Sequence, residues 1–142
     1  MGETTFEYDD LYRVTLETNP EGGKTKYSYD KVNNLRTITD PRGNQTFYKY
    51  DKLYRLQEEV DSLGNTTFYS YDGVGNLTSV KDRRGNTTKF EYDKVNRQTK
   101  RIDAEQQVIL TEYNAVGNVV QETDELKRKT KYAYDKLNRL KS

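Results

Sequence analysis

The dipeptide Tyr-Asp returns every 21 residues through almost the whole chain, and this periodicity constrains the fold more than any other feature. It begins at positions 8, 29, 50, 71, 92 and 134, and Tyr113-Asn114 fills the remaining slot. Leu or Val stands three residues after every one of these tyrosines. We therefore interpret residues 1–142 as a single array of six to seven repeats, without the central core of an ordinary globular domain.

Each repeat contains a segment with the alternation of a β-strand. The pattern Thr-x-Tyr-x-Tyr has a period of two, which places the threonine and both aromatic residues on one face. The aromatic positions that define this face are Tyr27, Tyr29, Tyr48, Tyr50, Tyr69, Tyr71, Phe90, Tyr92, Tyr132 and Tyr134. A second strand with poor alternation follows, at residues 35–39 in one copy and 56–60 in the next. One repeat thus predicts one β-hairpin.

Two tight turns separate the strands of each repeat. One of them follows Tyr-Asp, where Asp and Asn can bond their own backbone and tolerate left-handed conformations. The other has Asp at its first place and Gly at its fourth, a type I pattern that glycine closes with a bulge. Its residues in three copies are Asp40, Gly43, Asp61, Gly64, Asp82 and Gly85. Gln106 and Lys127 replace this glycine in later copies, and we expect those two turns to be looser or of another type.

The fold class predicted is all-β, with tandem hairpins forming one curled, twisted antiparallel sheet. Six cycles give on the order of twelve strands, and open sheets wider than about ten strands twist and curl. A strand lies between successive tyrosine strands, so a residue such as Leu35 should fill the space between their tyrosines. Each covered phenol needs a hydrogen-bond partner, and we expect water or neighbouring Asn and Thr side chains to supply it.

Composition excludes several classes of function. The 24 basic and 23 acidic residues are balanced and form no stripe, so no nucleic-acid partner is expected. No run of apolar residues is long enough to predict membrane insertion. The absence of Cys and His removes most catalytic triads and zinc sites, and the recurring aspartates are explained as turn initiators. We therefore assign no catalytic, cofactor-binding or metal-binding residue and expect no enzyme.

Phe47 and Phe68 depart from the repeat average. They occupy the position three residues before the tyrosine, which faces away from the tyrosine row and is usually polar. Two successive aromatic residues on a wet face suggest a contact patch, although drift within the repeat explains them equally well. We expect the isolated chain to form a homo-oligomer through this patch, through the tyrosine face or through its unpaired edge strands.

Residues 61–72 and the following Gly75-Asn76-Leu77 resemble the YD repeat of Rhs proteins, and the resemblance covers residues 4–141. Relatives in this family include bacterial Rhs polymorphic toxins, the cocoon components of insecticidal Tc toxins, and teneurins. The resemblance implies a spiralling sheet of hairpins that closes into a hollow shell around a toxic domain. It also implies a secreted or cell-surface location, with flanking repeats or toxin cargo as partners.

The leading hypothesis is a non-catalytic structural segment of a secreted or surface protein of this family, wall material of a shell that encloses a toxin or other cargo. Six or seven repeats are too few to close a shell, so we expect the chain to be part of a longer protein. An adhesive module that binds carbohydrate or a protein partner through the tyrosine-rich face is the alternative. A third reading is an enzyme with a catalytic carboxylate pair.

Overall fold

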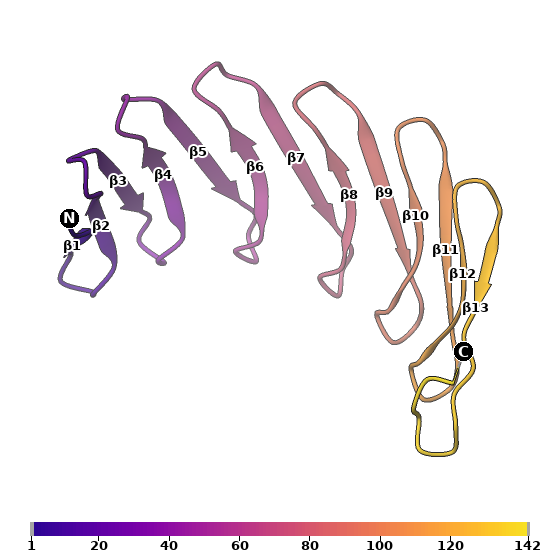
Figure 1. Ribbon diagram of the computed structural model, residues 1–142. Helices are drawn as coiled ribbons and strands as arrows, with labels where there is room; N and C mark the ends of the chain where they lie inside the picture. Colours follow the sequence, from indigo (N-terminus) through magenta and orange to yellow (C-terminus); the bar gives the residue numbers. More distant parts are fainter. Residues whose placement is uncertain (1, 142) are drawn as a thin grey trace. The chain divides into compact units, whose positions relative to one another are not determined.

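The computed structural model describes residues 2–141, and within them it contains β-strands and turns but no helix (Figure 1). The strands are β1 Thr5–Tyr8, β2 Val14–Thr18, β3 Lys24–Tyr29, β4 Leu35–Thr39, β5 Gln45–Tyr50, β6 Leu56–Val60, β7 Thr66–Tyr71, β8 Leu77–Lys81, β9 Thr87–Tyr92, β10 Gln98–Ile102, β11 Val108–Tyr113, β12 Val119–Thr123 and β13 Lys129–Lys131. The strands predicted at residues 35–39 and 56–60 are confirmed as β4 and β6. The all-β class is confirmed as well.

Neighbouring strands pair antiparallel, and their order follows the chain from β1 to β13. The chain divides into two compact units, Met1–Phe68 and Tyr69–Ser142, with the boundary inside β7. In the first unit β1 to β6 form successive hairpins and β6 pairs with the start of β7. In the second unit β8 to β13 do the same. The curl predicted for the whole sheet depends on how the units are placed, and it stays a prediction.

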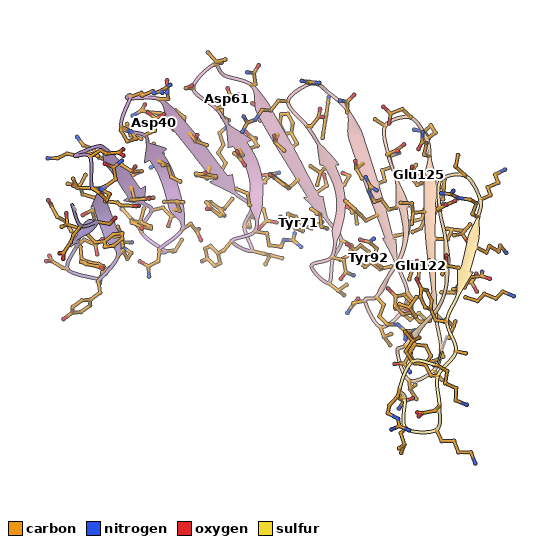
Figure 2. All side chains as sticks on the ribbon, in the orientation of Figure 1. Asp40, Asp61, Tyr71, Tyr92, Glu122 and Glu125 are labelled. Carbon is orange, nitrogen blue, oxygen red and sulfur yellow. The ribbon has the colours of Figure 1, made fainter. Side chains whose placement is uncertain are left out.

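The two faces of each tyrosine strand differ in exposure. In β5 the side chains of Thr46, Tyr48 and Tyr50 are half-buried, whereas those of Gln45, Phe47 and Lys49 are exposed. The same alternation recurs in β3, and from the second residue onward in β7, β9 and β11, whose side chains are drawn in Figure 2. The period of two in the sequence therefore predicted the face of the tyrosines in these strands correctly.

A β-bulge lies at the same place in five of the described hairpins, in each case where a tyrosine strand pairs with the strand that follows it. Ser28 pairs with Thr37 but Tyr29 pairs with Leu35, so Arg36 is the extra residue on β4. The same register shift occurs opposite Tyr8, Tyr50, Tyr92 and Tyr113. One extra residue on a strand moves the side chains beyond it to the opposite face of the sheet. This explains why the second strand shows poor alternation of polar and apolar residues in the sequence.

The sheet has no enclosed core. Among the described residues no hydrophobic side chain is buried, and the only buried residue is Thr123, at 8% exposure. Large apolar side chains at the turns are exposed, Leu63 to 84%. Stability must therefore come from contacts between adjacent strands and adjacent repeats, as in other linear repeat folds.

All the turns from residue 9 to residue 139 share one geometry. In the turn that begins at Asp40, the amide of Gly43 donates a hydrogen bond of 2.9 Å to the carbonyl of Asp40. The amide of Asp40 in turn donates one of 2.9 Å to the carbonyl of Asn44. Gly43 has the positive φ predicted for it, 88°. The expectation that the turns at Gln106 and Lys127 would be looser or of another type is wrong. These residues adopt φ of 64° and 63° and make the same backbone hydrogen bonds.

Gln106 and Lys127 can form the same turn because a type I turn with a bulge needs one residue in the left-handed conformation. Glycine adopts this conformation most easily, but other residues can adopt it too. Non-glycine residues occupy this position in seven turns: Tyr12, Asn33, Tyr54, Asn96, Gln106, Lys127 and Asn138. The hydrogen bonds of the turn hold them in a conformation that costs them roughly 1 kcal/mol or more. The same turn geometry therefore forms with or without glycine at the left-handed position, after an Asp or, at Asn19 and Asn114, an Asn.

Candidate functional site: the junction between repeats

An Asp side chain, or Asn at Asn19 and Asn114, accepts hydrogen bonds from backbone amides within each turn. In the turn that begins at Asp51, the Oδ1 atom accepts hydrogen bonds from the amides of Leu53 and Arg55, at 2.8 and 3.1 Å. Its Oδ2 atom accepts one from Nε of Arg55 at 2.7 Å. Asn44 takes the place of the arginine in the turn of Asp40, where its Nδ2 donates to Oδ2 at 2.8 Å. In the turns of Asp40 and Asp51 the first and fifth residues are therefore held together by their side chains.

These hydrogen bonds favour the charged carboxylate. The side chain of Arg55 has the largest effect on Asp51, whose pKa lies below its ordinary value of 3.8. For Asp40 the largest cause is the hydrogen bond from the side chain of Asn44, and its pKa is lowered too. Hydrogen bonding to the ionised form is a recognised cause of such shifts. The turn aspartates are thus structural anions, consistent with the prediction that they initiate turns.

The tyrosine of Tyr-Asp joins its repeat to the preceding one. The hydroxyl of Tyr50 donates a hydrogen bond of 2.8 Å to the backbone carbonyl of Leu35. The same bond joins Tyr29 to Val14, Tyr92 to Leu77, Tyr113 to Gln98 and Tyr134 to Val119, at 2.8 to 2.9 Å. In each case the acceptor lies 15 residues before the tyrosine. We refer to this hydrogen bond as the tyrosine staple.

The staple corrects one expectation. The partners predicted for the phenols were water or Asn and Thr side chains, but the staple tyrosines use a backbone carbonyl. The bulge explains this, because Leu35 lies opposite Tyr29 in the register and its carbonyl serves the next tyrosine, Tyr50. The expectation that Leu35 lies between two successive tyrosines is confirmed.

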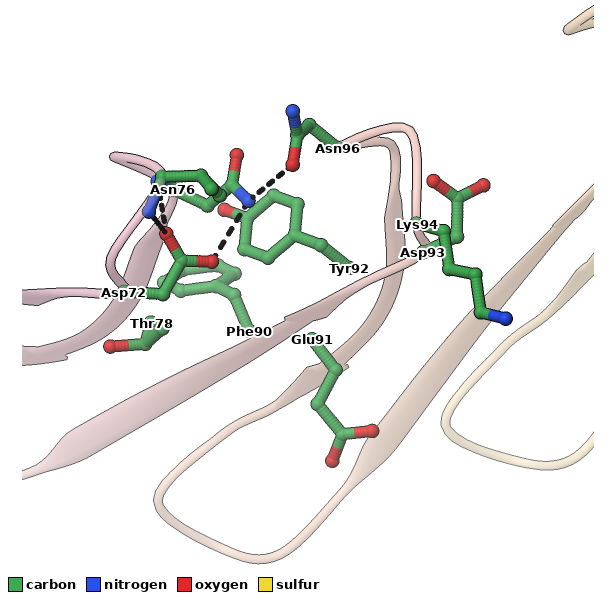
Figure 3. Close-up of a pocket in the computed structure, with 10 residues that line it drawn as sticks. Asp72, Asn76, Thr78, Phe90, Glu91, Tyr92, Asp93, Lys94 and Asn96 are labelled. Atoms are coloured by element: carbon green, nitrogen blue, oxygen red, sulfur yellow. Dashed lines mark hydrogen bonds between the residues drawn. The ribbon is translucent and has the colours of Figure 1, made fainter.

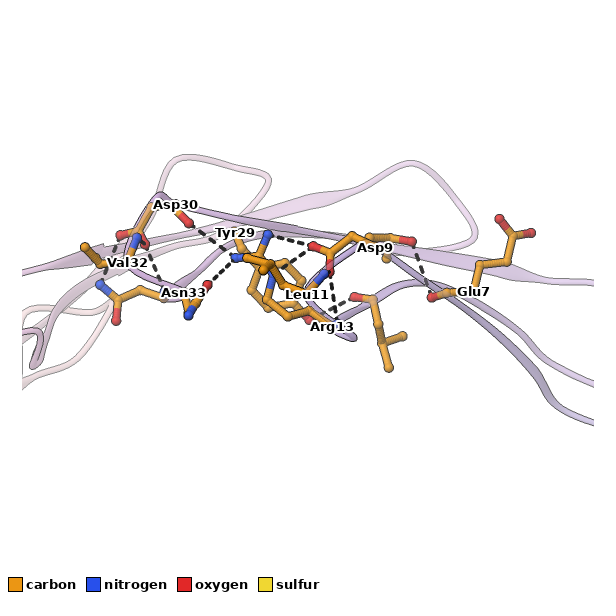
Figure 4. Close-up of polar contacts among 11 residues, drawn as sticks. Glu7, Asp9, Leu11, Arg13, Tyr29, Asp30, Val32 and Asn33 are labelled. Atoms are coloured by element: carbon orange, nitrogen blue, oxygen red, sulfur yellow. Dashed lines mark hydrogen bonds and ion pairs between the residues drawn. The ribbon is translucent and has the colours of Figure 1, made fainter.

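Arginine adds a second contact between repeats (Figure 4). The guanidinium carbon of Arg13 lies 4.6 Å from the ring centroid of Tyr29, within the range of a cation–π interaction. The same guanidinium contacts the next turn, since its Nη1 lies 2.7 Å from Oδ1 of Asn33. In the second unit Arg97 lies 4.6 Å from the ring of Tyr113 and donates to the carbonyl of Asn114. Each of these arginines bridges its own turn and the next.

Asparagine replaces arginine in every second repeat. The residue five places after the tyrosine is, in order, Arg13, Asn34, Arg55, Asn76, Arg97, Asn118 and Arg139. Nδ2 of Asn76 donates to Oδ2 of Asp72 at 2.9 Å and to Oδ1 of Asn96 in the next turn at 3.0 Å (Figure 3). Asn118 reaches Asn138 in the same way at 3.3 Å. The structural period is therefore two hairpins.

The other aromatic residue of the tyrosine strand has a different partner. The hydroxyl of Tyr27 donates to Oε2 of Glu17 at 2.9 Å, and that of Tyr132 donates to Oε2 of Glu122 at 2.6 Å. The carboxylate of Glu17 accepts from the neutral phenol, so this hydrogen bond is the main reason that the pKa of Tyr27 lies above its ordinary value of 10.0. These pairs again join a tyrosine strand to the strand before it.

Open hollows line the tyrosine face at equivalent places. A hollow of about 580 Å³ in the second unit is lined by Asp72, Asn76, Phe90 and Tyr92, among others (Figure 3). A smaller one of about 270 Å³ in the first unit is lined by residues 42 positions earlier, including Tyr48 and Tyr50. Both are open, and both lie beside a junction between repeats. They are a consequence of the repeat rather than a specialised pocket.

The structure separates the two groups of aromatic residues predicted from the sequence. Tyr29, Tyr50, Tyr92 and Tyr134 are brought to equivalent places as staple donors. Phe47 and Phe68 lie on the opposite face and are 41% and 42% exposed. Their role as a contact patch stays a prediction. Within residues 2–141 no cluster of three or more acidic side chains could hold a metal ion, and no helix is long and apolar enough to span a membrane.

Several junction residues were missed by the sequence reasoning. The carbonyl acceptors could not be recognised in the sequence, because every residue has a backbone carbonyl and an acceptor role does not require a particular residue type. The bridging Arg and Asn residues did leave a signal, since they alternate strictly at one position of the repeat. Glu17 and Glu122 left a weaker one, because only some copies have an acidic residue there.

The fold and these junctions define a linear array of β-hairpin repeats in which each repeat contacts its neighbours. The family model of the RHS Repeat matches residues 29–66, 71–108 and 113–142, which is more than half of the chain. The chain therefore belongs to the RHS repeat family. The three matches begin 42 residues apart, the same period at which Arg and Asn alternate.

Solved structures share this fold. A crystal structure of TcdB2-TccC3 superposes with a TM-score of 0.79 at 18% identity, covering 96% of this chain and 9% of that one. A crystal structure of TcdB2-TccC3-Cdc42 gives 0.72 at 20% identity, covering 82% and 7%. A Tc holotoxin pore of Photorhabdus luminescens gives 0.68 at 20% identity, covering 82% and 6%. The chain thus spans less than a tenth of these proteins. A comparison with curated protein sequences finds no significant match.

Proposed function

We propose that this chain is non-catalytic wall material of a larger secreted or cell-surface RHS repeat protein, and that the wall encloses a toxin or other cargo. The observation that carries the proposal is the tyrosine staple. It uses the most regular side chain of the repeat to hold the preceding repeat, as Tyr50 holds Leu35 and Tyr92 holds Leu77. A surface built in this way extends by adding repeats.

The enclosure of cargo rests on family membership and on the fold shared with chains of Tc toxin structures. In that setting the partners are flanking repeats and the cargo itself. A secreted or extracellular location has the same support, because the neighbours include a holotoxin pore. A wall needs no reactive group, and the turn aspartates have structural roles in holding Arg55 or Asn44.

The tyrosine contacts favour the wall over the adhesive alternative. A hydroxyl that donates to a backbone carbonyl is no longer available to donate to a sugar or a peptide. Tyr27 and Tyr132 are likewise held by Glu17 and Glu122. An adhesive function would therefore have to use the faces of the rings and the shallow hollows beside them.

The test uses a longer protein that contains this segment and its cargo. Phe substituted at Tyr50, Tyr92, Tyr113 and Tyr134 removes four staples while keeping the rings. We expect faster digestion of the cargo by an added protease, whereas Tyr12→Phe, at an exposed turn position, should leave the cargo protected. If the protease digests the cargo of the unaltered protein as fast as the cargo of the variant without the four staples, the wall does not enclose the cargo.

A glycan array tests the adhesive alternative. Binding that disappears on Tyr48→Ala but survives Tyr12→Ala would favour adhesion.

A further inference from the structure

Every lysine that lies in a described strand is on the face opposite the tyrosines. Lys89 stands three residues before Tyr92, so the alternation of β9 places the two side chains on opposite sides of the sheet. The partners of Lys89 in the register, Ser79 and Ile102, lie on the same side as Lys89. We call this side of the second unit the lysine face, after its five strand lysines: Lys81, Lys89, Lys100, Lys129 and Lys131. The strand lysines of the first unit have the same facing: Lys24, Lys26 and Lys49.

The overall balance of charge in the sequence does not hold on the lysine face, where the strands place five lysines but only two glutamates. Glu91 forms an ion pair of 2.9 Å with Lys100, and Glu112 accepts a hydrogen bond from Gln121. The other four lysines of this face are exposed, and none of them forms an ion pair within residues 2–141. The lysine face is therefore a surface of positive charge without its own counter-ions.

An aliphatic strip crosses the lysine face at β10 and β11. Ile102 pairs with Val108 across these two strands, and Leu110 follows Val108 on the same face of β11. Leu110 is 37% exposed, and the other two side chains are half-buried. The first unit has apolar residues at two of the equivalent positions, Val60 and Phe68, 42 residues earlier in the chain. The strip thus recurs with the period of two hairpins.

Lysines border this strip on both sides. Lys89 lies opposite Ile102 on one side. On the other side Thr123 lies opposite Leu110, and Lys129 lies opposite Thr123. An open hollow of about 390 Å³ beside Lys89 and Ile102 adds depth at one border. Since a lysine side chain is longer than an aliphatic one, its charged group stands further from the sheet, so the surface is a shallow apolar floor between two positive borders.

These features are complementary to an acidic peptide segment that also has apolar side chains. Such a segment would place its apolar side chains on Ile102, Val108 and Leu110, and its carboxylates beside the lysines. The borders are four strand spacings apart from β9 to β13, about 19 Å. A helix with its side chains is about 10–12 Å across, so one helix has room between them. Complementary charge of this kind also selects against basic competitors.

Two other anionic partners match the lysine face less well. A membrane would have to admit the aliphatic strip to a depth of about 5–10 Å, and the longer lysine side chains on both sides hold the strip away from it. A nucleic acid is bound through phosphate contacts together with aromatic rings on which its bases stack. Within residues 77–131 the strands place no aromatic ring on this face. The aliphatic strip therefore favours a peptide.

We propose that the lysine face of the second unit binds an acidic, amphipathic peptide segment. In a wall built as proposed above, this segment belongs to the enclosed cargo, and that assignment rests on the proposed function. The binding itself depends only on the lysines and the aliphatic strip. Each lysine contributes an exposed ion pair, which is worth up to about fivefold in affinity, so the binding is modest and weakens as salt is added.

The probe for this site is a synthetic amphipathic helix of leucine and glutamate that carries a fluorophore. Its anisotropy is followed as the 142-residue chain is added. The border variant combines Lys89→Gln with Lys129→Gln and removes one charge from each side of the strip. Its matched control combines Lys94→Gln with Lys136→Gln, which removes two exposed lysines from turns of the same unit. Leu110→Thr shortens the strip and keeps a β-branched residue in the strand.

We expect the border variant to bind the probe about four- to twentyfold more weakly than the unaltered chain, and the control variant to bind within about twofold. Leu110→Thr should weaken binding by about threefold or more, because part of the apolar contact is lost. A probe in which lysine replaces glutamate should not bind. Circular dichroism verifies that each variant is folded.

A chain that does not bind the probe overturns the proposal, and so does a border variant that binds it as tightly as the unaltered chain. Either result leaves the wall function standing, since protection of cargo from protease tests that function separately. Polyglutamate that binds as tightly as the probe would also overturn the proposal, because the aliphatic strip would then have no part in binding. Tighter binding of an oligonucleotide, or of anionic vesicles, would assign the lysine face to a different partner.

Discussion

The hydroxyl of Tyr50 lies 2.8 Å from the backbone carbonyl of Leu35, one repeat earlier in the chain. Leu35 lies opposite Tyr29 in the register of β3 and β4, so the same residue separates two successive tyrosines and bonds to the second. This relationship converts a row of amphipathic side chains into a continuous connection between repeats. It also explains how a sheet without an enclosed core remains ordered along its length.

Acid should destabilise the chain through its turn aspartates. The pKa of Asp51 is lowered, chiefly by the side chain of Arg55, so its contribution is complete above the ordinary value of 3.8 and is lost as the pH falls through the lower folded value. The urea midpoint should be nearly constant from about pH 7 to 5 and fall below about pH 4. Because eight other aspartates also have a lowered pKa, Asp51→Asn should make this acid limb only slightly shallower, and Asp10→Asn should leave it unchanged. An identical acid limb in Asp51→Asn would contradict the account.

At the left-handed position of the turn, replacing glycine should destabilise the chain and introducing glycine should stabilise it. An added Cβ at Gly75 or Gly73 meets no atom within 4 Å, but only Gly75 has a positive φ, 101°. Gly75→Ala should therefore destabilise the chain by about 1 kcal/mol in urea unfolding, and Gly73→Ala should cost nothing. Gln106→Gly should stabilise by a similar amount, about 0.5 to 1 kcal/mol. Equal effects at the two glycines would show that φ does not decide the cost.

The guanidinium plane of Arg97 should matter beyond its charge. It lies over the ring of Tyr113, is bonded to Asp93 at 2.7 Å and donates to the carbonyl of Asn114. Arg97→Lys keeps the charge but loses the planar fork, and it should lower the free energy of unfolding by about 1 kcal/mol. Among the described residues no tyrosine ring lies under the guanidinium of Arg128, so Arg128→Lys should change the free energy of unfolding by less than about half as much. Comparable losses would argue against the stacking contact.

Alkaline titration should report the pair of Tyr27 and Glu17. The folded pKa of Tyr27 is raised above 10.0, so the contribution of the pair is present below that pH and is lost as the pH rises through the raised value. In ultraviolet absorbance titration, Glu17→Gln should move one late-titrating tyrosine to lower pH, while Glu21→Gln, at an exposed turn, should not. A curve that Glu17→Gln leaves unaltered would mean that the hydrogen bond is absent in solution.

The sequence predicted the hairpin, both turns and the face of each tyrosine, because these depend on local patterns of period two and on Asp and Gly at fixed places. It could not predict the bulge at Arg36, since a bulge is defined by what lies opposite it and not by residue type. For the same reason the acceptor carbonyl of Leu35 was missed and the partners of the phenols were predicted wrongly. The turn at Gln106 was misjudged because an unfavourable conformation is imposed by the hydrogen bonds around it.

Urea unfolding of Tyr50→Phe beside Tyr12→Phe decides whether the tyrosine staple holds adjacent repeats together. Both substitutions remove one hydroxyl, but only that of Tyr50 donates to the preceding repeat, while Tyr12 is 89% exposed in a turn. The account predicts that Tyr50→Phe lowers the free energy of unfolding by about 1 kcal/mol and that Tyr12→Phe leaves it unchanged. If the two variants are equally stable, the tyrosine staple does not hold the repeats together.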